Sequence, residues 1–485
     1  MQYKWIVLTN TTLAVLMATL DINIVVIAIP SIGRNLRNTS LLDLLWVLLG
    51  YQLVLACLLV NFGRLADMFG RVKLYNLGFL IFTVGSALCS LSQDGIQLVI
   101  FRMIQGVGGA FLVSNSAAII IDSFPKNERG RALGINRVSQ VAGAAGGLVL
   151  GGFLTTVGGW QAIFWVNVPI GIFGTLWSHY KLRELGSLDT NTKVDILGNI
   201  TFAASLAILL AGISLYALGS LQFSYFISLV TGGIALFALF VMIENRVENP
   251  MLNLTLFRIR TFTGGTLATF LNSLARGCVL LVMTSYLQGP TMSLDPLVAG
   301  LFLLPNAISS SVFGPISGFL SDRGGTRFYT TLGLSVTSVG FLLLAQIGAT
   351  TTFLMLALSL GLIGAGDGIF MAPNRAAVIS SVAPSRRGVA SAVNSTFIQT
   401  GNSFSRAFAF LIMGIIIPGS VLQTIFSGTS NLSSDPVFIS EFVSSLHLVF
   451  YVCSGLTMIA IVPSIMRGKI SEISEDEVLG ESDGG

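Results

Sequence analysis

Charged residues are scarce in this sequence. They make up 10% of its 485 residues, whereas a soluble globular domain has about 25%. Apolar residues make up 53%, and the mean hydropathy is +0.82. Because about 20 apolar residues cross a hydrocarbon core some 30 Å thick, the chain has room for many spans and for no large soluble domain. We therefore predict an all-α integral membrane protein.

Residue types that serve catalysis are also few. The chain has two histidines, His179 and His447, far apart in sequence, and neither H-E-x-x-H nor G-x-x-x-x-G-K-[ST] occurs. The four cysteines lie inside apolar runs, which argues against a disulfide framework or a thiolate metal site. The 26 basic and 22 acidic residues are mixed along the chain, which is not typical of a nucleic-acid footprint. We expect no enzyme activity, no cofactor, no metal site and no nucleic-acid partner.

Apolar runs bounded by turn and charge clusters predict fourteen transmembrane helices. They fall at 5-30, 42-62, 73-91, 96-121, 132-157, 161-179, 194-216, 223-243, 262-287, 297-318, 329-348, 351-373, 388-417 and 442-466.

The distribution of Lys and Arg orients these spans. Basic residues are retained on the cytoplasmic side of a membrane. If the spans alternate, the segments on one side carry clusters such as Arg64, Arg71 and Lys73, and those on the other side carry only Arg34 and Arg37. This predicts a multi-pass protein of the cell membrane with both termini in the cytoplasm, and an acidic cytoplasmic tail at 469-485.

The chain contains an internal repeat. NERGRALGIN at 127-136 aligns with SRRGVASAVN at 385-394, and the spacing of GRLADMFGR from Gly63 recurs in GFLSDRGG from Gly318. We predict two related six-helix halves, 1-185 and 258-468, separated by two additional spans with their linkers at 186-257. Duplicated halves that meet near the midplane of the membrane are typical of transporters.

Several motifs in order resemble those of a known family. They are LDINIVVIAIP at 20-30, GRLADMFGRVK from Gly63, FRMIQGVGGA from Phe101, WQAIFWVNVPIG from Trp160 and ENRVENPMLNLTLFRIRTF at 244-262. Together they resemble the major facilitator superfamily, and within it the fourteen-span drug:proton antiporters, over almost the whole chain. The fifth span departs from the antiporter motif G-P-x-x-G-G, since Leu148 stands where that motif has proline.

The resemblance implies a major facilitator fold and proton-coupled export of amphipathic small molecules, that is, multidrug efflux by alternating access. It also implies a cytoplasmic gate in the loop after the second span and in its repeat, formed by Gly63, Asp67, Gly70, Arg71, Asp322 and Arg323. We expect the protein to act as a monomer in the lipid bilayer, with small molecules and protons as its partners.

Charged residues inside spans are the leading functional candidates, because burying one costs at least about 2.5 kcal/mol. Asp21 and Arg102 both fall in the outer third of the membrane, and the resemblance places their helices side by side, so we expect them to interact as the proton-coupling pair. Burial favours the neutral acid and a nearby cation favours the carboxylate, so Asp21 could bind and release a proton in turn. The alternative is a permanent ion pair that never titrates.

Further polar residues are candidates for the substrate cavity, namely Asp21, Asn23, Gln105, Arg276 and Asp367. Asp367 could serve a cationic substrate or the coupling, or could neutralise Arg375 two turns later. Five arginines lie within spans against only Asp21 and Asp367, and this surplus keeps open a second hypothesis, a proton-coupled carrier of a specific anionic or zwitterionic metabolite.

Glycines of the fifth span form a predicted packing seam. Gly143, Gly147 and Gly151 recur every four residues and share one helix face, next to Gly152, which permits close helix approach. The seam serves packing alone, or it is a hinge-like contact between the two halves.

Overall fold

The computed structural model describes residues 2–125, 128–186, 194–247, 249–383, 386–427 and 436–467, and these ranges contain helices and no strand. The predicted tail at 469-485 lies outside the described residues. The first half comprises α1 (Tyr3–Asn35), α2 (Leu41–Phe69), α3 (Arg71–Ser90), α4 (Gly95–Ser123), α5 (Arg129–Gly158), α6 (Ala162–Trp165) and α7 (Asn167–Lys181). An additional hairpin follows, α8 (Ile196–Ala217) and α9 (Phe223–Glu244).

The rest of the chain repeats this pattern of long helices. It comprises η1 (Leu254–Arg258), α10 (Arg260–Arg276), α11 (Val279–Gln288), α12 (Pro296–Gly324), α13 (Thr326–Leu344), α14 (Phe353–Ser380), α15 (Arg387–Ile416), α16 (Gly419–Ser427) and α17 (Pro436–Met466).

Twelve helical segments among the described residues are long and apolar enough to cross a membrane, and one of them is α10 and α11 taken together. Two of the fourteen predicted spans are not among them. The span predicted at 161-179 is interrupted at Val166 into α6 and α7. The span predicted at 388-417 is α15, which has 30 residues but carries polar side chains such as Asn394, Gln399 and Asn402.

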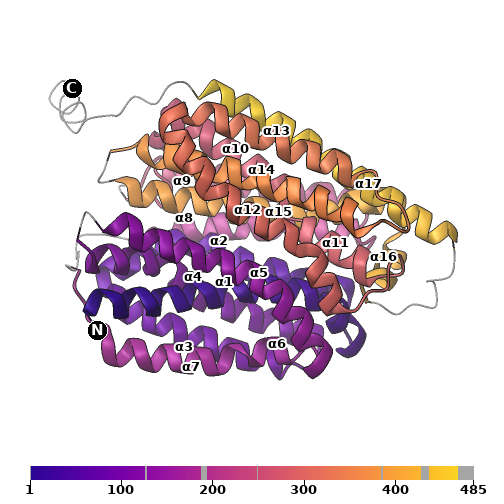
Figure 1. The fold of residues 1–485 in the computed structure, drawn as a ribbon, viewed down its shortest axis with the longest axis horizontal. Coiled ribbons are helices and arrows are strands. Elements are labelled where there is room, and N and C mark those ends of the chain that lie inside the picture. Colours follow the sequence, from indigo (N-terminus) through magenta and orange to yellow (C-terminus); the bar gives the residue numbers. More distant parts are fainter. Residues whose placement is uncertain are drawn as a thin grey trace.

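The long helices lie roughly side by side, with α1 to α7 on one side of the bundle and α10 to α17 on the other (Figure 1). The start of α1 and the end of α17 lie at the same end of the bundle. We call this the basic end, since helix ends there carry Arg71, Arg258 and Arg327. The opposite end holds the α1–α2 turn.

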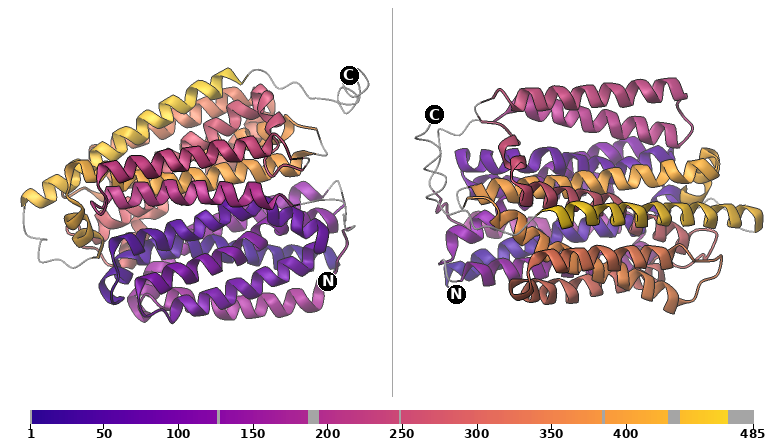
Figure 2. Two further views of the ribbon diagram at one scale, coloured as in Figure 1. Left: turned by 180° about the vertical axis from the view of Figure 1, so that it is seen from behind. Right: turned by 90° about the horizontal axis from the view of Figure 1, so that it is seen from above.

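The additional hairpin lies along the junction of the two sides, as the view from behind shows (Figure 2). Asn199 of α8 donates a hydrogen bond to the carbonyl of Cys57 in α2. A Cβ at Gly414 of α15 would meet the carbonyl of Ala217 at 2.9 Å. The helix α8 therefore contacts both sides, whereas α9 covers its outer face.

Local signals in the sequence set several helix starts. At α2, the Ser40 hydroxyl accepts from the Asp43 N–H at 3.1 Å while the Asp43 carboxylate accepts from the Ser40 N–H at 2.8 Å, a reciprocal capping box. At α4, Asp94 caps the N–H of Gln97 at 2.8 Å. Gly70 has φ +105, a conformation that glycine adopts without strain, and it lets α3 follow α2 directly.

The predicted glycine seam lies against two different helices. A Cβ at Gly143 or Gly147 would meet a backbone carbonyl of α1 at 2.7 Å, and one at Gly151 would meet the backbone of Ile24 in α1 at 3.0 Å. Only Gly152 faces the other side of the bundle, where a Cβ would meet the backbone of Pro296 and Leu297 in α12 at 2.5 Å. Three of the four glycines therefore contact another helix of the first half, and only Gly152 contacts the second half.

We predict that Gly147→Ala lowers the stability of the protein by about 1 to 3 kcal/mol, because the new methyl group overlaps the α1 backbone. The matched control is Gly146→Ala, since nothing lies within 4 Å of a Cβ at Gly146. Thermal unfolding of the detergent-solubilised variants measures both effects. Equal losses for the two variants would show that helix propensity, and not the α1–α5 contact, decides the outcome.

Candidate functional site

Asp21 lies at the centre of a buried polar cluster. Its Oδ2 accepts from Arg102 Nη1 at 2.5 Å, and its Oδ1 accepts from Gln105 Nε2 and Asn167 Nδ2, each at 2.8 Å. The side chains of Asp21 and Arg102 are 0% and 1% exposed. Helices α4 and α7 thus direct three donors at one carboxylate of α1. The structure brings Asp21 and Arg102 together, as the sequence predicts. It adds Gln105, which the sequence suggests only as a residue of the substrate cavity.

The Arg102 guanidinium contacts hydrogen-bond acceptors and aromatic rings as well as Asp21. It donates to Gln105 Oε1 at 2.6 Å and to the Val47 carbonyl of α2 at 3.3 Å. Its guanidinium carbon lies 4.4 Å from the centre of the Tyr51 ring and 5.8 Å from that of Phe164. Aromatic faces attract a guanidinium when water is excluded. The cation therefore has both a carboxylate and a ring face as partners.

Two members of the cluster escape prediction from the sequence. Asn167 directly follows the break between α6 and α7, and Ser86 of α3 accepts from Gln105 at 2.7 Å. Asn167 does stand in the motif from Trp160, so a polar residue in the middle of a predicted span is the signal that could have found it. Nothing in the sequence singles out Ser86.

Asn23, predicted to line the substrate cavity, is not part of this cluster. Its amide donates to the carbonyl of Thr19 one turn earlier on the same helix at 2.8 Å. A Cβ at Gly147 would meet the Asn23 Cβ at 3.0 Å. Asn23 therefore lies on the face of α1 that packs against α5.

Arg276 and Asp367 form a second ion pair, at 2.9 Å. Asn272 donates to the same carboxylate at 3.1 Å and Ser310 at 3.4 Å. The pair joins α10 to α14 and is more open than the first, because the Arg276 side chain is 32% exposed. Arg375 instead donates to Ser391 at 3.3 Å, so the partner of Asp367 is Arg276.

The remaining three of the five arginines predicted within spans form no ion pair with a carboxylate among the described residues. They are Arg137, Arg375 and Arg406. Arg137 donates to Gln140 within α5 and Arg406 of α15 to Gln52 of α2. Arg137 also lies within electrostatic range of Asp367, Arg276 and Arg375. A group of cations with one carboxylate thus lies between α5, α10 and α14.

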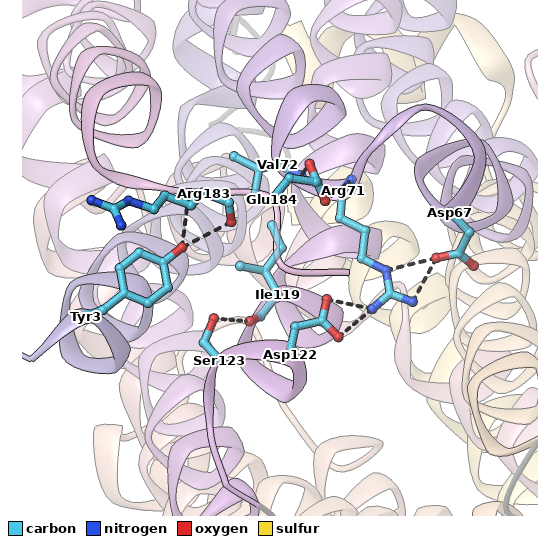
Figure 3. A network of polar contacts seen from close by, with 9 residues as sticks. All are labelled: Tyr3, Asp67, Arg71, Val72, Ile119, Asp122, Ser123, Arg183 and Glu184. Carbon is cyan, nitrogen blue, oxygen red and sulfur yellow. Dashed lines mark hydrogen bonds and ion pairs between the residues drawn. The ribbon is translucent and has the colours of Figure 1, made fainter. Parts of the chain in front are cut away.

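The predicted gate loop forms a network at the basic end (Figure 3). Arg71 donates through Nε to Asp67 at 2.8 Å and through Nη1 to Asp122 at 2.7 Å. The carboxylate of Glu184 accepts the backbone N–H groups of Arg71 at 2.9 Å and Val72 at 3.0 Å. The network connects α2, α3, α4 and the segment after α7. The sequence singles out neither Asp122 nor Glu184.

The repeat of this loop has no such network. Asp322 and Arg323 are exposed and form no ion pair among the described residues. The Arg323 guanidinium lies 5.0 Å from the centre of the Phe319 ring. In α2, before the first loop, a Cβ at Gly63 would meet nothing within 4 Å. The α2–α3 loop therefore forms ion pairs, whereas the related α12–α13 loop forms none among the described residues.

The sequence matches the sequence pattern of one protein family over most of its length. Residues 11–243, 191–405 and 265–469 each match the Major Facilitator Superfamily. The chain belongs to the Major Facilitator Superfamily.

Named relatives of this superfamily member are transporters. The chain is 30% identical to "Riboflavin transporter RibZ" of Clostridioides difficile over 84% of this chain and 88% of that protein. It is also 30% identical to "Multidrug resistance protein Stp" of Mycobacterium tuberculosis, over 89% and 79%. It resembles the solved structure of a bacterial homolog of the human lysosomal transporter Spinster, inward-facing and unoccupied, with a TM-score of 0.69 and 18% identity, over 96% and 97%. The protein is a multi-pass membrane transporter and not an enzyme.

We predict that Arg102→Met destabilises this superfamily member by about 3 to 5 kcal/mol, because it leaves the Asp21 carboxylate buried without its cation. Adding Asp21→Asn should recover part of the loss, so the two changes are not additive. Arg276→Met should cost less, since its ion pair is partly exposed. Thermal unfolding in detergent at neutral pH measures five proteins, namely the wild type, Asp21→Asn, Arg102→Met, the double variant and Arg276→Met. Equal losses for the two Arg→Met variants would contradict the prediction.

Proposed function

We propose that the protein is a proton-coupled antiporter that exports amphipathic small molecules by alternating access, with Asp21 as its proton-coupling residue. The observation that carries this proposal is the geometry of Asp21, a fully buried carboxylate that accepts from three donors on two other helices. Relatives named as multidrug, tetracenomycin C and methylenomycin A resistance proteins support the export of small molecules.

The Asp21 cluster has the chemistry that coupling needs. Three donors and no acceptor suit the carboxylate form of Asp21. A proton bound to that carboxylate would occupy an acceptor position, so it competes with Arg102 or an amide donor for the same oxygen. Protonation and the arrangement of α1, α4 and α7 are thereby linked. A proton that arrives from one side favours separation of Arg102 from Asp21, and its release favours their return.

We further propose that the halves at 1-185 and 258-468 are the moving units, with both termini in the cytoplasm. The contact of Gly152 with α12 supports a seam between the halves at the end opposite the basic end. The Arg71 network would hold the gate at the basic end. Such an exporter needs one copy of the chain, in keeping with the monomer expected from the sequence.

Transport in proteoliposomes under an imposed pH gradient tests this function. A panel of cationic, neutral and anionic compounds identifies a transported one. We expect the wild type to accumulate it against its gradient and to acidify the compartment that the substrate leaves. Asp21→Asn should lose proton-driven accumulation and retain downhill exchange.

The matched control is Asp367→Asn, which removes the second carboxylate that the sequence places within a span and should leave the response to the pH gradient in place. If Asp21→Asn still couples transport to protons, Asp21 is a permanent ion-pair member. If only Asp367→Asn uncouples transport, the coupling residue is Asp367.

A second candidate function is proton-coupled transport of a specific anionic or zwitterionic metabolite. The observation that favours it is the group of Arg137, Arg276 and Arg375, which outnumber the single carboxylate of Asp367 among them. A carboxylate or phosphate of a substrate could replace Asp367 as the partner of Arg276, because the pair is partly exposed.

For that function we expect Arg276→Ala to abolish transport of anionic compounds and to spare neutral ones, because only an anion needs the guanidinium. Arg323→Ala is the control, since Arg323 is an exposed arginine at the basic end without an ion pair among the described residues. Uptake of matched anionic and neutral compounds measures the ratio. An unchanged ratio in Arg276→Ala would remove this candidate.

A further inference from the structure

A groove lies between α3 and α7 on the outer surface of the bundle. These two helices form one edge of the molecule, away from the second half (Figure 1). The groove has a volume of about 560 Å³ and is lined by Val72, Lys73, Leu74, Asn76, Leu77, Leu80, Thr175, His179 and Glu184. None of the functions proposed above uses it.

The groove is polar at the basic end and apolar farther along. Lys73 lies in the first turn of α3, and His179 lies in the last turn of α7. Leu77 and Leu80 of α3 are 40% and 51% exposed and lie about 6 and 10 Å from Lys73 along the helix axis. The two ends therefore suit a ligand with a polar head and an apolar body.

The polar end has a cation without an ion-pair partner among the described residues. Glu184 is the acidic residue of the lining, and its two oxygens accept the N–H groups of Arg71 and Val72. Lys73 is exposed and forms no ion pair or hydrogen bond with the described residues. Its ammonium group and the exposed ring of His179 are left to meet a ligand. The ammonium group of Lys73 can pair with an anion, and a ring nitrogen of His179 can donate a hydrogen bond to it.

We propose that this groove binds an anionic phospholipid of the leaflet at the basic end, with its phosphate at Lys73 and His179 and an acyl chain along Leu77 and Leu80. A basic recess between membrane helices, at the depth of the headgroups, is where such lipids bind. A soluble anion would gain nothing from the apolar floor. Through Glu184 and Val72, the bound lipid would lie beside the Arg71 network.

Native mass spectrometry of the full-length protein tests the proposal, after delipidation and addition of phosphatidylglycerol or phosphatidylcholine. We expect retained phosphatidylglycerol in the wild type and about fivefold weaker binding in Lys73→Gln, the effect of one basic residue at a membrane surface. The control is Lys181→Gln, which removes an equal charge from an exposed position of α7 outside the groove. Equal losses in the two variants would overturn the proposal in favour of general surface charge.

The apolar half of the groove is tested by Leu80→Trp, which fills the floor at an exposed position and leaves the charge in place. We expect it to weaken phosphatidylglycerol binding while the monodispersity of the protein is unchanged. Competition by inorganic phosphate as effective as that by the lipid would show a simple anion site. Equal binding of phosphatidylcholine by the wild type would show that the headgroup charge is not recognised, and either result overturns the proposal.

Discussion

The buried pair of Asp21 and Arg102 is the constraint on which the rest of the first half depends. Two charges removed from water are tolerated when they are paired and hydrogen-bonded with good geometry. Glycines make this possible, because a Cβ at Gly85 would meet the backbone of Gln105 at 2.8 Å and one at Gly109 would meet the Tyr51 hydroxyl at 2.5 Å. Close packing of α2, α3 and α4 thus brings Gln105 and Tyr51 to the ion pair.

The second half contains a related pair with reversed charges. In the first half the acid lies on the first helix and the arginine on the fourth, whereas Arg276 lies on α10 and Asp367 on α14, the first and fourth long helices of the predicted second half. The first pair is closed to solvent, and the second is partly open at Arg276. A closed pair suits control of a proton, and an open pair suits exchange of partners. This difference supports different roles for the two ion pairs, with proton coupling at the first and substrate binding at the second.

The sequence predicts those features that depend on one helix at a time. The apolar runs predict where the helices lie. The depth of Asp21 and Arg102 in their spans predicts that both lie at the same level in the membrane. The four-residue spacing predicts that Gly143, Gly147 and Gly151 share one helix face. It does not give features that depend on which helix a face meets. Three seam glycines therefore turn out to contact α1, and Asp367 meets Arg276 on another helix instead of Arg375. Residues Asn167 and Asp122 acquire partners only through tertiary packing.

The additional hairpin has a consequence for how the halves can move. Its helix α8 is hydrogen-bonded to α2 through Asn199 and packs closely on α15 at Gly414, while Arg64 of α2 donates to the backbone carbonyls of Asn249 and Pro250 beyond α9. A helix that contacts both halves on one side resists their separation on that side. On the other side the halves meet where α5 packs closely on α12 through Gly152 and Gly300. Glycine contacts suit such a place, because backbones without side chains between them can slide with little repacking.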